Sequence, residues 1–170
     1  KQSNIDIVPE RTGITMGTAM SGIATTAFTQ DALSGASHKK VGPRFIPKIL
    51  GNIAAANISI NYNIQGPSFT ISTACSSGGD AINMACMCIQ SGKADVMIAV
   101  GAESVLCPLV IYSLANAKSL SRRNDTPKTA SRPFDITRDG FVIGEGGGAL
   151  VIETEAHALA RGAKIYAEIK

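Results

Sequence analysis

The run "ADVMIAVGAES" (94–104) constrains the fold more than any other part of this sequence. It is almost continuously apolar, which is typical of a β-strand in a sheet that is covered on both faces. Helical patterns stand on either side of it, at 76–92 and 108–118. Because strand and helix patterns alternate in this way, the sequence predicts an α/β layered fold.

The alternation extends along the rest of the chain. Strands are predicted at 12–20, at 68–74, at 141–153 as two strands around a glycine turn, and at 164–170. Helices are predicted at 21–35, 45–64, 76–92, 108–118 and 154–162, with Thr154 as an N-cap and glycines beyond several helix ends. A long polar loop is predicted at 119–140.

Composition limits the classes of protein that need to be considered. The 170 residues are enough for one domain with a core, and 45% hydrophobic against 17% charged residues is a globular composition. A net charge of +3 is too mild to imply nucleic-acid binding. No run of about 18 apolar residues is present, so no membrane span is predicted.

The four cysteines do not have the pattern of a disulfide framework, because a chain this rich in apolar residues needs no such cross-links. Cys86 and Cys88 are two positions apart on a predicted helix and point to different faces. Neither histidine stands at a ligand spacing from a cysteine, so no metal site is predicted. We expect no cofactor and a reducing, cytoplasm-like compartment.

Cys75 ends a predicted strand and precedes a predicted helix. The partial positive charge and free N–H groups of a helix N-terminus favour a thiolate, and the backbone at such a turn can donate to an oxyanion. Small neighbours leave room for a substrate. The alternative is a small buried filler. From position alone both interpretations of Cys75 stand, whereas Cys86, Cys88 and Cys107 are predicted to pack in the core.

"GEGGG" (144–148) invites comparison with a phosphate-binding loop. It is predicted to join two strands and not to open a helix, so the cradle of N–H groups would be absent. Close packing of strands is the better interpretation.

Five longer motifs of the sequence resemble segments of one known family. "GPSFTISTACSSG", "ADVMIAVGAES", "SLSRRND", "ASRPFDITRDGFVIGEGGGALVIE" and "HALARGAKIYAEI" resemble, in the same order, segments of the β-ketoacyl-(acyl carrier protein) synthases. The resemblance covers nearly the whole chain and is greatest to the discrete, type II elongating enzymes of fatty acid biosynthesis.

That resemblance implies a thiolase-like layered fold, built from two similar βαβαβαββ halves, and a homodimer. It implies that Cys75 accepts an acyl chain from a carrier protein and condenses it with the carbanion left by decarboxylation of malonyl-carrier protein. The backbone N–H of Cys75 would then be one oxyanion donor. Met20 matches a position that lines the acyl pocket, and Phe141 matches a residue close to the nucleophile.

The resemblance also implies that much of the family's machinery lies elsewhere. The family's two catalytic histidines and its lysine match no residue of this chain; His157 falls on a surface helix and His38 in a loop. We therefore expect residues 1–170 to be a synthase N-terminal domain truncated at both ends. The isolated chain is expected not to catalyse condensation.

The loop from 118 to 138 carries basic residues, namely Lys118, Arg122, Arg123, Lys128, Arg132 and Arg138. It is either a solvated loop or a docking surface for an acidic carrier protein and its phosphopantetheine-linked acyl and malonyl groups. Lys118 matches a basic family position that faces the carrier protein.

Three other kinds of protein share features of the fatty acid enzyme. A polyketide ketosynthase shares the chemistry, although modular polyketide domains usually carry Asp where this chain has Ser72. A non-catalytic chain-length-factor-like dimer partner usually lacks the nucleophile, whereas this chain keeps Cys75. A thiolase shares the fold and the thiol, but the "TACSSG" and "RPFD…RDGFV" contexts argue against it.

Overall fold

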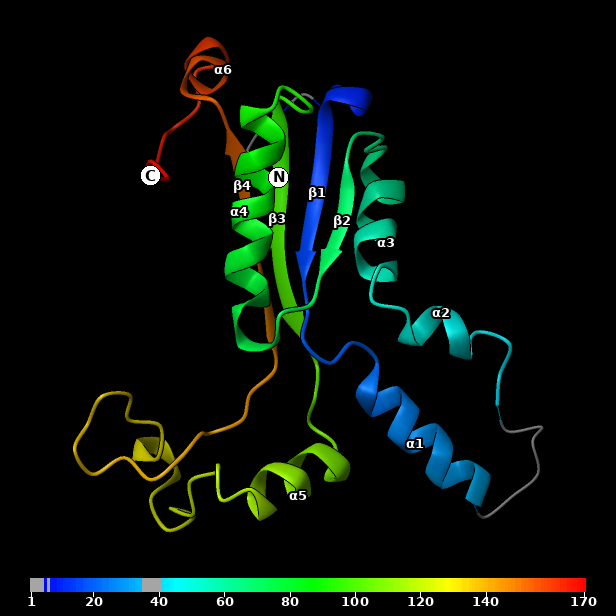
Figure 1. Ribbon diagram of the computed structural model, residues 1–170, viewed down its shortest axis with the longest axis vertical. Coiled ribbons are helices and arrows are strands. Elements are labelled where there is room, and N and C mark those ends of the chain that lie inside the picture. The colour runs from blue at the N-terminus through cyan, green and yellow to red at the C-terminus, as the bar shows by residue number, and fades with distance from the viewer. Residues whose placement is uncertain (1–4, 6, 35–40) are drawn as a thin grey trace. The chain divides into compact units, whose positions relative to one another are not determined.

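A computed structural model of the chain describes residue 5 and residues 7–34 and 41–170 (Figure 1). The principal elements, in order, are β1 (Thr12–Gly17), α1 (Ile23–Ser34), α2 (Phe45–Ile49), α3 (Ile53–Tyr62), β2 (Ser68–Ile71), α4 (Ser77–Gln90), β3 (Val96–Glu103), α5 (Pro108–Asn116), β4 (Gly146–Glu153) and α6 (Glu155–Ala160). The alternation of strands and helices confirms the predicted α/β class.

The strands form one four-stranded sheet in the order β2-β1-β3-β4. β1 runs parallel to both of its neighbours, and Ile14 stands opposite Ser68 on one side and Ile98 on the other. The carboxyl ends of β1, β2 and β3 therefore share one edge of the sheet. Ligands of open parallel α/β sheets bind beyond this edge, so the segments that leave it are the first place to look for a site.

Successive residues of β3 pack against different helices, as a strand covered on both faces requires. One core cluster joins Met97 and Ala99 of β3 to Ala85 and Cys88 of α4. A second joins Val100, the next residue along, to Ile14 and Met16 of β1 and Ala55 of α3. The sheet is thus a middle layer between α4 and α3, as Figure 1 shows.

Contacts along the chain divide it into two compact units. The first contains the sheet with α3, α4 and α6, and consists of Lys1–Ser21, Leu50–Glu103 and Gly147–Lys170. The second contains α1, α2, α5 and the polar loop, and consists of Gly22–Ile49 and Ser104–Gly146. The second unit has its own apolar cluster, in which Val105, Cys107 and Val110 pack with residues of α1.

Two predicted strands are wrong. The segment 141–153 holds a single strand, β4, and Phe141 makes only an isolated bridge to Leu120. Ahead of β4, the Glu145 carboxylate accepts hydrogen bonds from Ser104 and Leu106, so this stretch is held by a side chain and not by a strand ladder. Residues 164–170 are irregular, because an alternating sequence becomes a strand only where a neighbouring strand pairs with it.

The helix ends follow their sequence signals. Thr154 caps α6 by accepting a hydrogen bond from the His157 N–H at 3.2 Å, as predicted. Gly92 and Gly162, beyond α4 and α6, both have a φ of +65° to +69°, the left-handed conformation that ends helices at glycine. None of the helices in the described part of the chain is long and apolar enough to cross a membrane.

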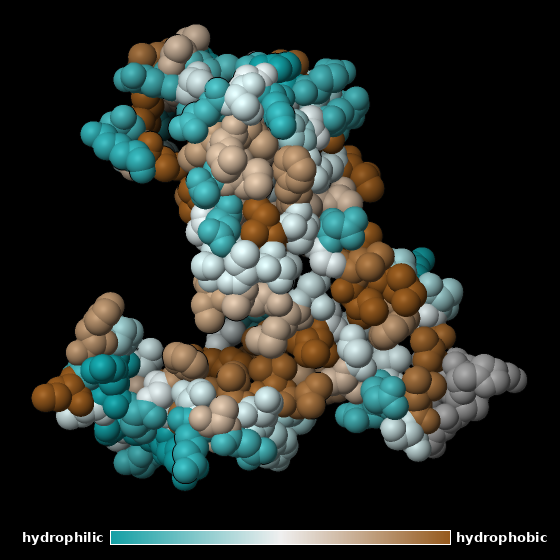
Figure 2. All heavy atoms as spheres, in the orientation of Figure 1, coloured by the Kyte–Doolittle hydropathy of each residue, from teal (hydrophilic) through white to brown (hydrophobic). Residues whose placement is uncertain are grey.

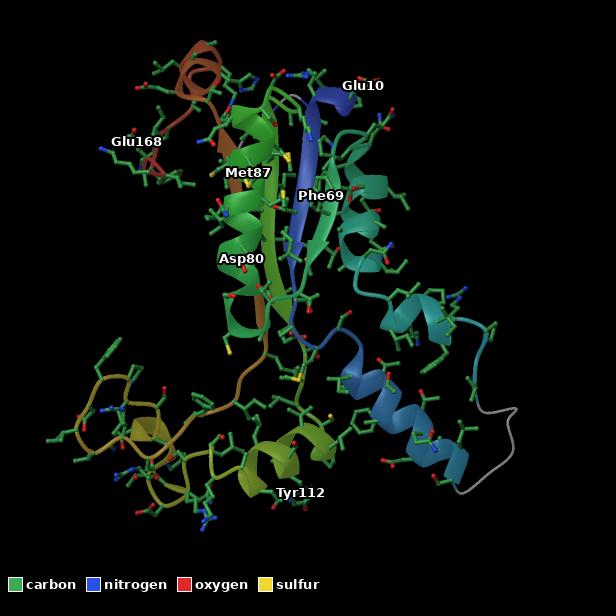
Figure 3. All side chains as sticks on the ribbon, viewed as in Figure 1. Glu10, Phe69, Asp80, Met87, Tyr112 and Glu168 are labelled. Carbon is green, nitrogen blue, oxygen red and sulfur yellow. The ribbon has the colours of Figure 1, made fainter. Side chains whose placement is uncertain are left out.

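Apolar side chains also remain on the surface. Figure 2 shows brown apolar atoms reaching the exterior beside α3, where Ile60 is 78% exposed. On β2, an edge strand of the sheet, Phe69 is 42% exposed (Figure 3). Both residues belong to the unit that contains the sheet.

Candidate active site

Cys75 lies at the carboxyl edge of the sheet, in a tight 3-10 turn (Ala74–Ser76) between the end of β2 and the start of α4. Cys75 is an exposed residue. The preceding residue, Ala74, has a φ of +53°, which is a costly conformation for a residue with a Cβ. A strained turn from strand to helix holds a nucleophile clear of the sheet in other enzymes, so this geometry favours the catalytic interpretation of Cys75.

Side chains around the cysteine hold this turn in place. Ser77 Oγ accepts a hydrogen bond from the Thr73 N–H at 2.9 Å and donates one to the Ala74 carbonyl at 2.6 Å. Ser76 Oγ donates to the Thr73 carbonyl at 2.8 Å. The two serines were interpreted from the sequence only as small neighbours that leave room for a substrate. Their hydroxyls in fact satisfy the backbone of the strained turn.

A glycine in β1 sets how closely α4 approaches the sheet. A Cβ added to Gly17 would lie 2.3 Å from the Ser77 carbonyl oxygen and 2.7 Å from the Gly78 nitrogen. One turn further along α4, buried Thr15 donates a hydrogen bond to the Ala81 carbonyl at 2.8 Å. The first turn of α4, and with it the Cys75 turn, is therefore seated directly on β1.

Met20 lies in the turn after β1, at the same edge of the sheet and in the same unit as Cys75. The Glu103 carboxylate, at the end of β3, accepts hydrogen bonds from the Ala19 N–H at 2.6 Å and the Met20 N–H at 2.9 Å. The Ala19 carbonyl in turn accepts a 3.4 Å hydrogen bond from Ser72, three residues before Cys75. Sequence reasoning missed Glu103, since its partners are more than 80 positions away.

Phe141 and Lys118 belong to the other unit and lie at the two ends of its polar loop. Phe141 is 64% exposed, and its N–H donates to the Ser119 carbonyl at 2.7 Å, next to Lys118. Lys118 is exposed and has a φ of +56° just beyond α5. The structure thus brings these two predicted residues into one region, although 22 residues separate them along the chain.

The acidic residues of this loop organise the basic ones. Asp139 accepts hydrogen bonds from Ser121 Oγ at 2.7 Å and from Arg123 Nε at 3.3 Å. The bond from Ser121 is the largest cause that lowers the pKa of Asp139, and the nearby arginine adds to it. The loop is therefore tied together internally, while Lys118 stands on its exterior.

Two of the three remaining cysteines are core residues, as predicted, while Cys86 is only partly buried. Cys88 is 3% exposed on α4, and Cys107 is 1% exposed ahead of α5. Cys86 is half-buried on the same helix as Cys88. This confirms the predicted packing roles of the two buried thiols and separates them from the exposed Cys75.

His157 has a structural partner, while His38 lies outside the described residues. The Nδ1 of His157 is 2.6 Å from the Glu153 carboxylate, which also accepts from Arg161. The bond from Arg161 is the largest cause that lowers the pKa of Glu153. This cluster joins β4 to α6.

Residues 2–158 match the family model described as the N-terminal domain of β-ketoacyl synthase. The chain belongs to the β-ketoacyl synthase family. Its thiolase-like fold, present in part, is confirmed by the likeness to solved ketosynthases. One of these, a type II polyketide synthase (PKS) acyl-carrier protein in complex with its ketosynthase, has a TM-score of 0.83 at 32% identity, over 97% of this chain and 43% of that one.

Curated relatives of this β-ketoacyl synthase chain are named 3-oxoacyl-[acyl-carrier-protein] synthases. It is 45% identical over 159 residues to the 3-oxoacyl-[acyl-carrier-protein] synthase 2 of Vibrio cholerae, covering 94% of this chain and 38% of the relative. It is 44% identical over 161 residues to the mitochondrial 3-oxoacyl-[acyl-carrier-protein] synthase of Arabidopsis thaliana, covering 94% and 35%. The chain thus spans under two fifths of the length of these relatives.

Proposed function

We propose that this β-ketoacyl synthase chain carries the nucleophile of a 3-oxoacyl-(acyl carrier protein) synthase of fatty acid biosynthesis. One observation carries the proposal: an exposed cysteine stands on a strained turn, at the carboxyl edge of three parallel strands and just ahead of a 14-residue helix. Relatives named for that activity support the choice of substrate class.

In the proposed first step, the Cys75 sulfur attacks the carbonyl carbon of an acyl thioester on the carrier protein. A carbon–sulfur bond to Cys75 forms, the bond to the carrier's sulfur breaks, and the carrier thiol takes up a proton. The positive end of the α4 dipole favours the attacking thiolate, and the backbone N–H of Cys75 is proposed as an oxyanion donor.

In the second step, malonyl-carrier protein loses CO₂, and the resulting carbanion attacks the carbonyl carbon of the thioester on Cys75. A carbon–carbon bond forms, the carbon–sulfur bond to Cys75 breaks, and Cys75 leaves as a thiolate. Met20 is proposed to line the acyl chain, because the turn that contains it is fastened to the same edge of the sheet. Phe141 is proposed as a substrate contact on its sequence match alone. We also propose that the isolated 170-residue chain forms no condensation product, since its two histidines are not at the family's catalytic positions.

The carrier protein is proposed to dock on the basic loop beside Lys118. That lysine is exposed and outside the internal ion pairs of the loop, and acyl carrier proteins are acidic. A related ketosynthase has been solved in complex with an acyl-carrier protein, which supports the choice of partner.

A homodimer is proposed as the assembly. Within the part of the chain that the structure describes, no strand pairs with the outer side of β2, and Phe69 on that strand is substantially exposed. An unpaired strand edge with an exposed aromatic residue is a template for pairing with another chain. A cytoplasmic location is proposed from the four free thiols; the Arabidopsis relative, named as mitochondrial, marks an organelle as the alternative.

Acyl loading tests the proposal. The protein is mixed with long-chain acyl-carrier protein and quenched, and the modified residue is located by mass spectrometry. In the wild type, Cys75 is expected to carry the acyl group, and Cys75→Ala is expected to carry none. Cys86→Ala, which changes a half-buried thiol of α4, is expected to load normally. Acylation that persists in Cys75→Ala would contradict the proposal. Loading by a polyketide carrier protein alone would favour a polyketide ketosynthase, the function of a structural relative.

A further inference from the structure

Asp80 lies in the first turn of α4, at the N-terminal end of the helix, just after the Cys75 turn (Figure 3). Its Oδ2 accepts a short hydrogen bond from Thr73 Oγ1, and it lies 3.2 Å from Ser76 Oγ, whose single proton it shares with the nearer Thr73 carbonyl at 2.8 Å. Thr73 precedes Cys75 by two residues and Ser76 follows it by one. A single carboxylate oxygen therefore ties together the two sides of the turn that presents the thiol.

The turn needs such ties. With a φ of +53°, Ala74 occupies a conformation that persists only where the surroundings over-determine it. Ser76 Oγ also lies 3.1 Å from Thr73 Oγ1, so the two hydroxyls and the carboxylate form one closed group. Asp80 is the charged member of this group, and hydrogen bonds to a charged acceptor are about twice as strong as neutral ones.

We propose that Asp80 is a positioning residue, which holds the hydroxyls of Thr73 and Ser76 and so keeps Cys75 in its reactive orientation. The inference rests on the proposed function, in which Cys75 accepts the acyl group. Asp80 acts through its neighbours and takes no part in the bonds that form and break. Its charge is unfavourable for a nearby thiolate, so its value to the site lies in its hydrogen bonds.

Two substitutions separate the hydrogen bonds from the charge. Asp80→Asn removes the charge but keeps a side-chain oxygen that can accept from both hydroxyls. Asp80→Ala removes both the charge and the acceptor. Because the two variants are equally neutral, any difference between them reports the hydrogen bonds alone. Thr73→Val removes the matching donor with little change of shape, and Asn83→Ala, at an exposed position of α4, is the control.

The experiment measures single-turnover acyl loading of Cys75 against the concentration of acyl-carrier protein, well below each variant's unfolding temperature. In Asp80→Ala the maximal rate is expected to fall about 100-fold, the cost of a small misplacement of a reacting group, while half-saturation stays unchanged. Asp80→Asn is expected to load within about threefold of the wild type, since it retains the acceptor. Thr73→Val is expected to repeat the loss, and adding Asp80→Ala to it should cost little more, because both remove one interaction.

Wild-type loading in Asp80→Ala, or equal slowing in Asp80→Ala and Asp80→Asn, would overturn the inference. If Asp80→Ala does not fold, the loading rates of Thr73→Val and Asp80→Asn are compared instead. A slow Thr73→Val beside a near-normal Asp80→Asn then supports the inference, and equal rates overturn it. If the wild type itself accepts no acyl group, the proposed function fails. Amide hydrogen exchange then tests separately whether Asp80 holds the turn in place. Exchange at Thr73 and Ser76 is then expected to be faster in Asp80→Ala than in Asp80→Asn, and equal exchange overturns the inference.

Discussion

Gly17→Ala tests whether the close approach of β1 to α4 sets the position of the nucleophile. The new Cβ would lie 2.3 Å from the Ser77 carbonyl oxygen, 2.5 Å from its carbonyl carbon and 2.7 Å from the Gly78 nitrogen. All three are backbone atoms, so no side-chain rotation can relieve the clash. The first turn of α4 must therefore move by roughly 1 Å, since ordinary contacts of a Cβ begin at 3.4 Å.

That displacement has two measurable consequences. Forcing one extra carbon into a packed site destabilises a protein by about 1–3 kcal/mol. At this chain length each kcal/mol lowers the unfolding temperature by about 2–4 °C. Because Cys75 stands at the start of the displaced turn, acyl loading is expected to slow by about 100-fold for a misplacement near 1 Å. Thermal unfolding followed by circular dichroism measures the first effect, and quenched-flow mass spectrometry measures the second.

The matched control is Gly42→Ala, because a Cβ at that position meets none of the described residues within 4 Å. It should unfold and load as the wild type does. If Gly17→Ala also unfolds at the wild-type temperature and loads at the wild-type rate, then the seating of α4 on β1 does not govern the Cys75 turn.

Two further predictions concern the Glu153 ion-pair cluster and the basic loop. The pKa of Glu153 is lowered, first by its hydrogen bond from Arg161, so the stability that it contributes is present above the ordinary value of 4.5 and is lost as the pH falls through its lower folded value. Urea unfolding between pH 7 and pH 3 should therefore show a shallower acid decline in Glu153→Gln, and parallel curves would count against this ion-pair cluster. Lys118→Glu in the complete protein should raise the KM for carrier-bound substrate and leave the loading of Cys75 from a small acyl thioester unchanged; an unaltered KM would refute docking there.

Much of the fold follows from local patterns in the sequence. The apolar run at 94–104 predicted β3, because a strand covered on both faces buries apolar side chains on each of them. The caps of α6 and the glycine beyond α4 were also predictable from the sequence, since capping depends on residues next to the helix end. The predictions that failed, at 141–153 and 164–170, concerned strands, whose existence depends on a partner far away in the sequence.

The candidate site divides in the same way. Position at a strand-to-helix junction was enough to separate Cys75 from the buried Cys88 and Cys107. The resemblance to β-ketoacyl synthases added Met20, Phe141 and Lys118 as proposals. No local pattern pointed to Glu103, whose carboxylate holds the Met20 turn from another strand, or to the contact of Gly17 with the first turn of α4.

The sequence by itself determined which residue is the nucleophile candidate and which elements surround it, because propensity, capping and apolar periodicity act over a few residues. Only the tertiary structure decided how that residue is held. The left-handed Ala74 and the hydrogen bonds from Thr73 and Ser76 to Asp80 depend on the backbone conformation of the turn, which is not one that residues with a Cβ usually adopt. The backbone contact of Gly17 with Ser77 joins segments that lie far apart in the chain, and no short stretch of sequence records it.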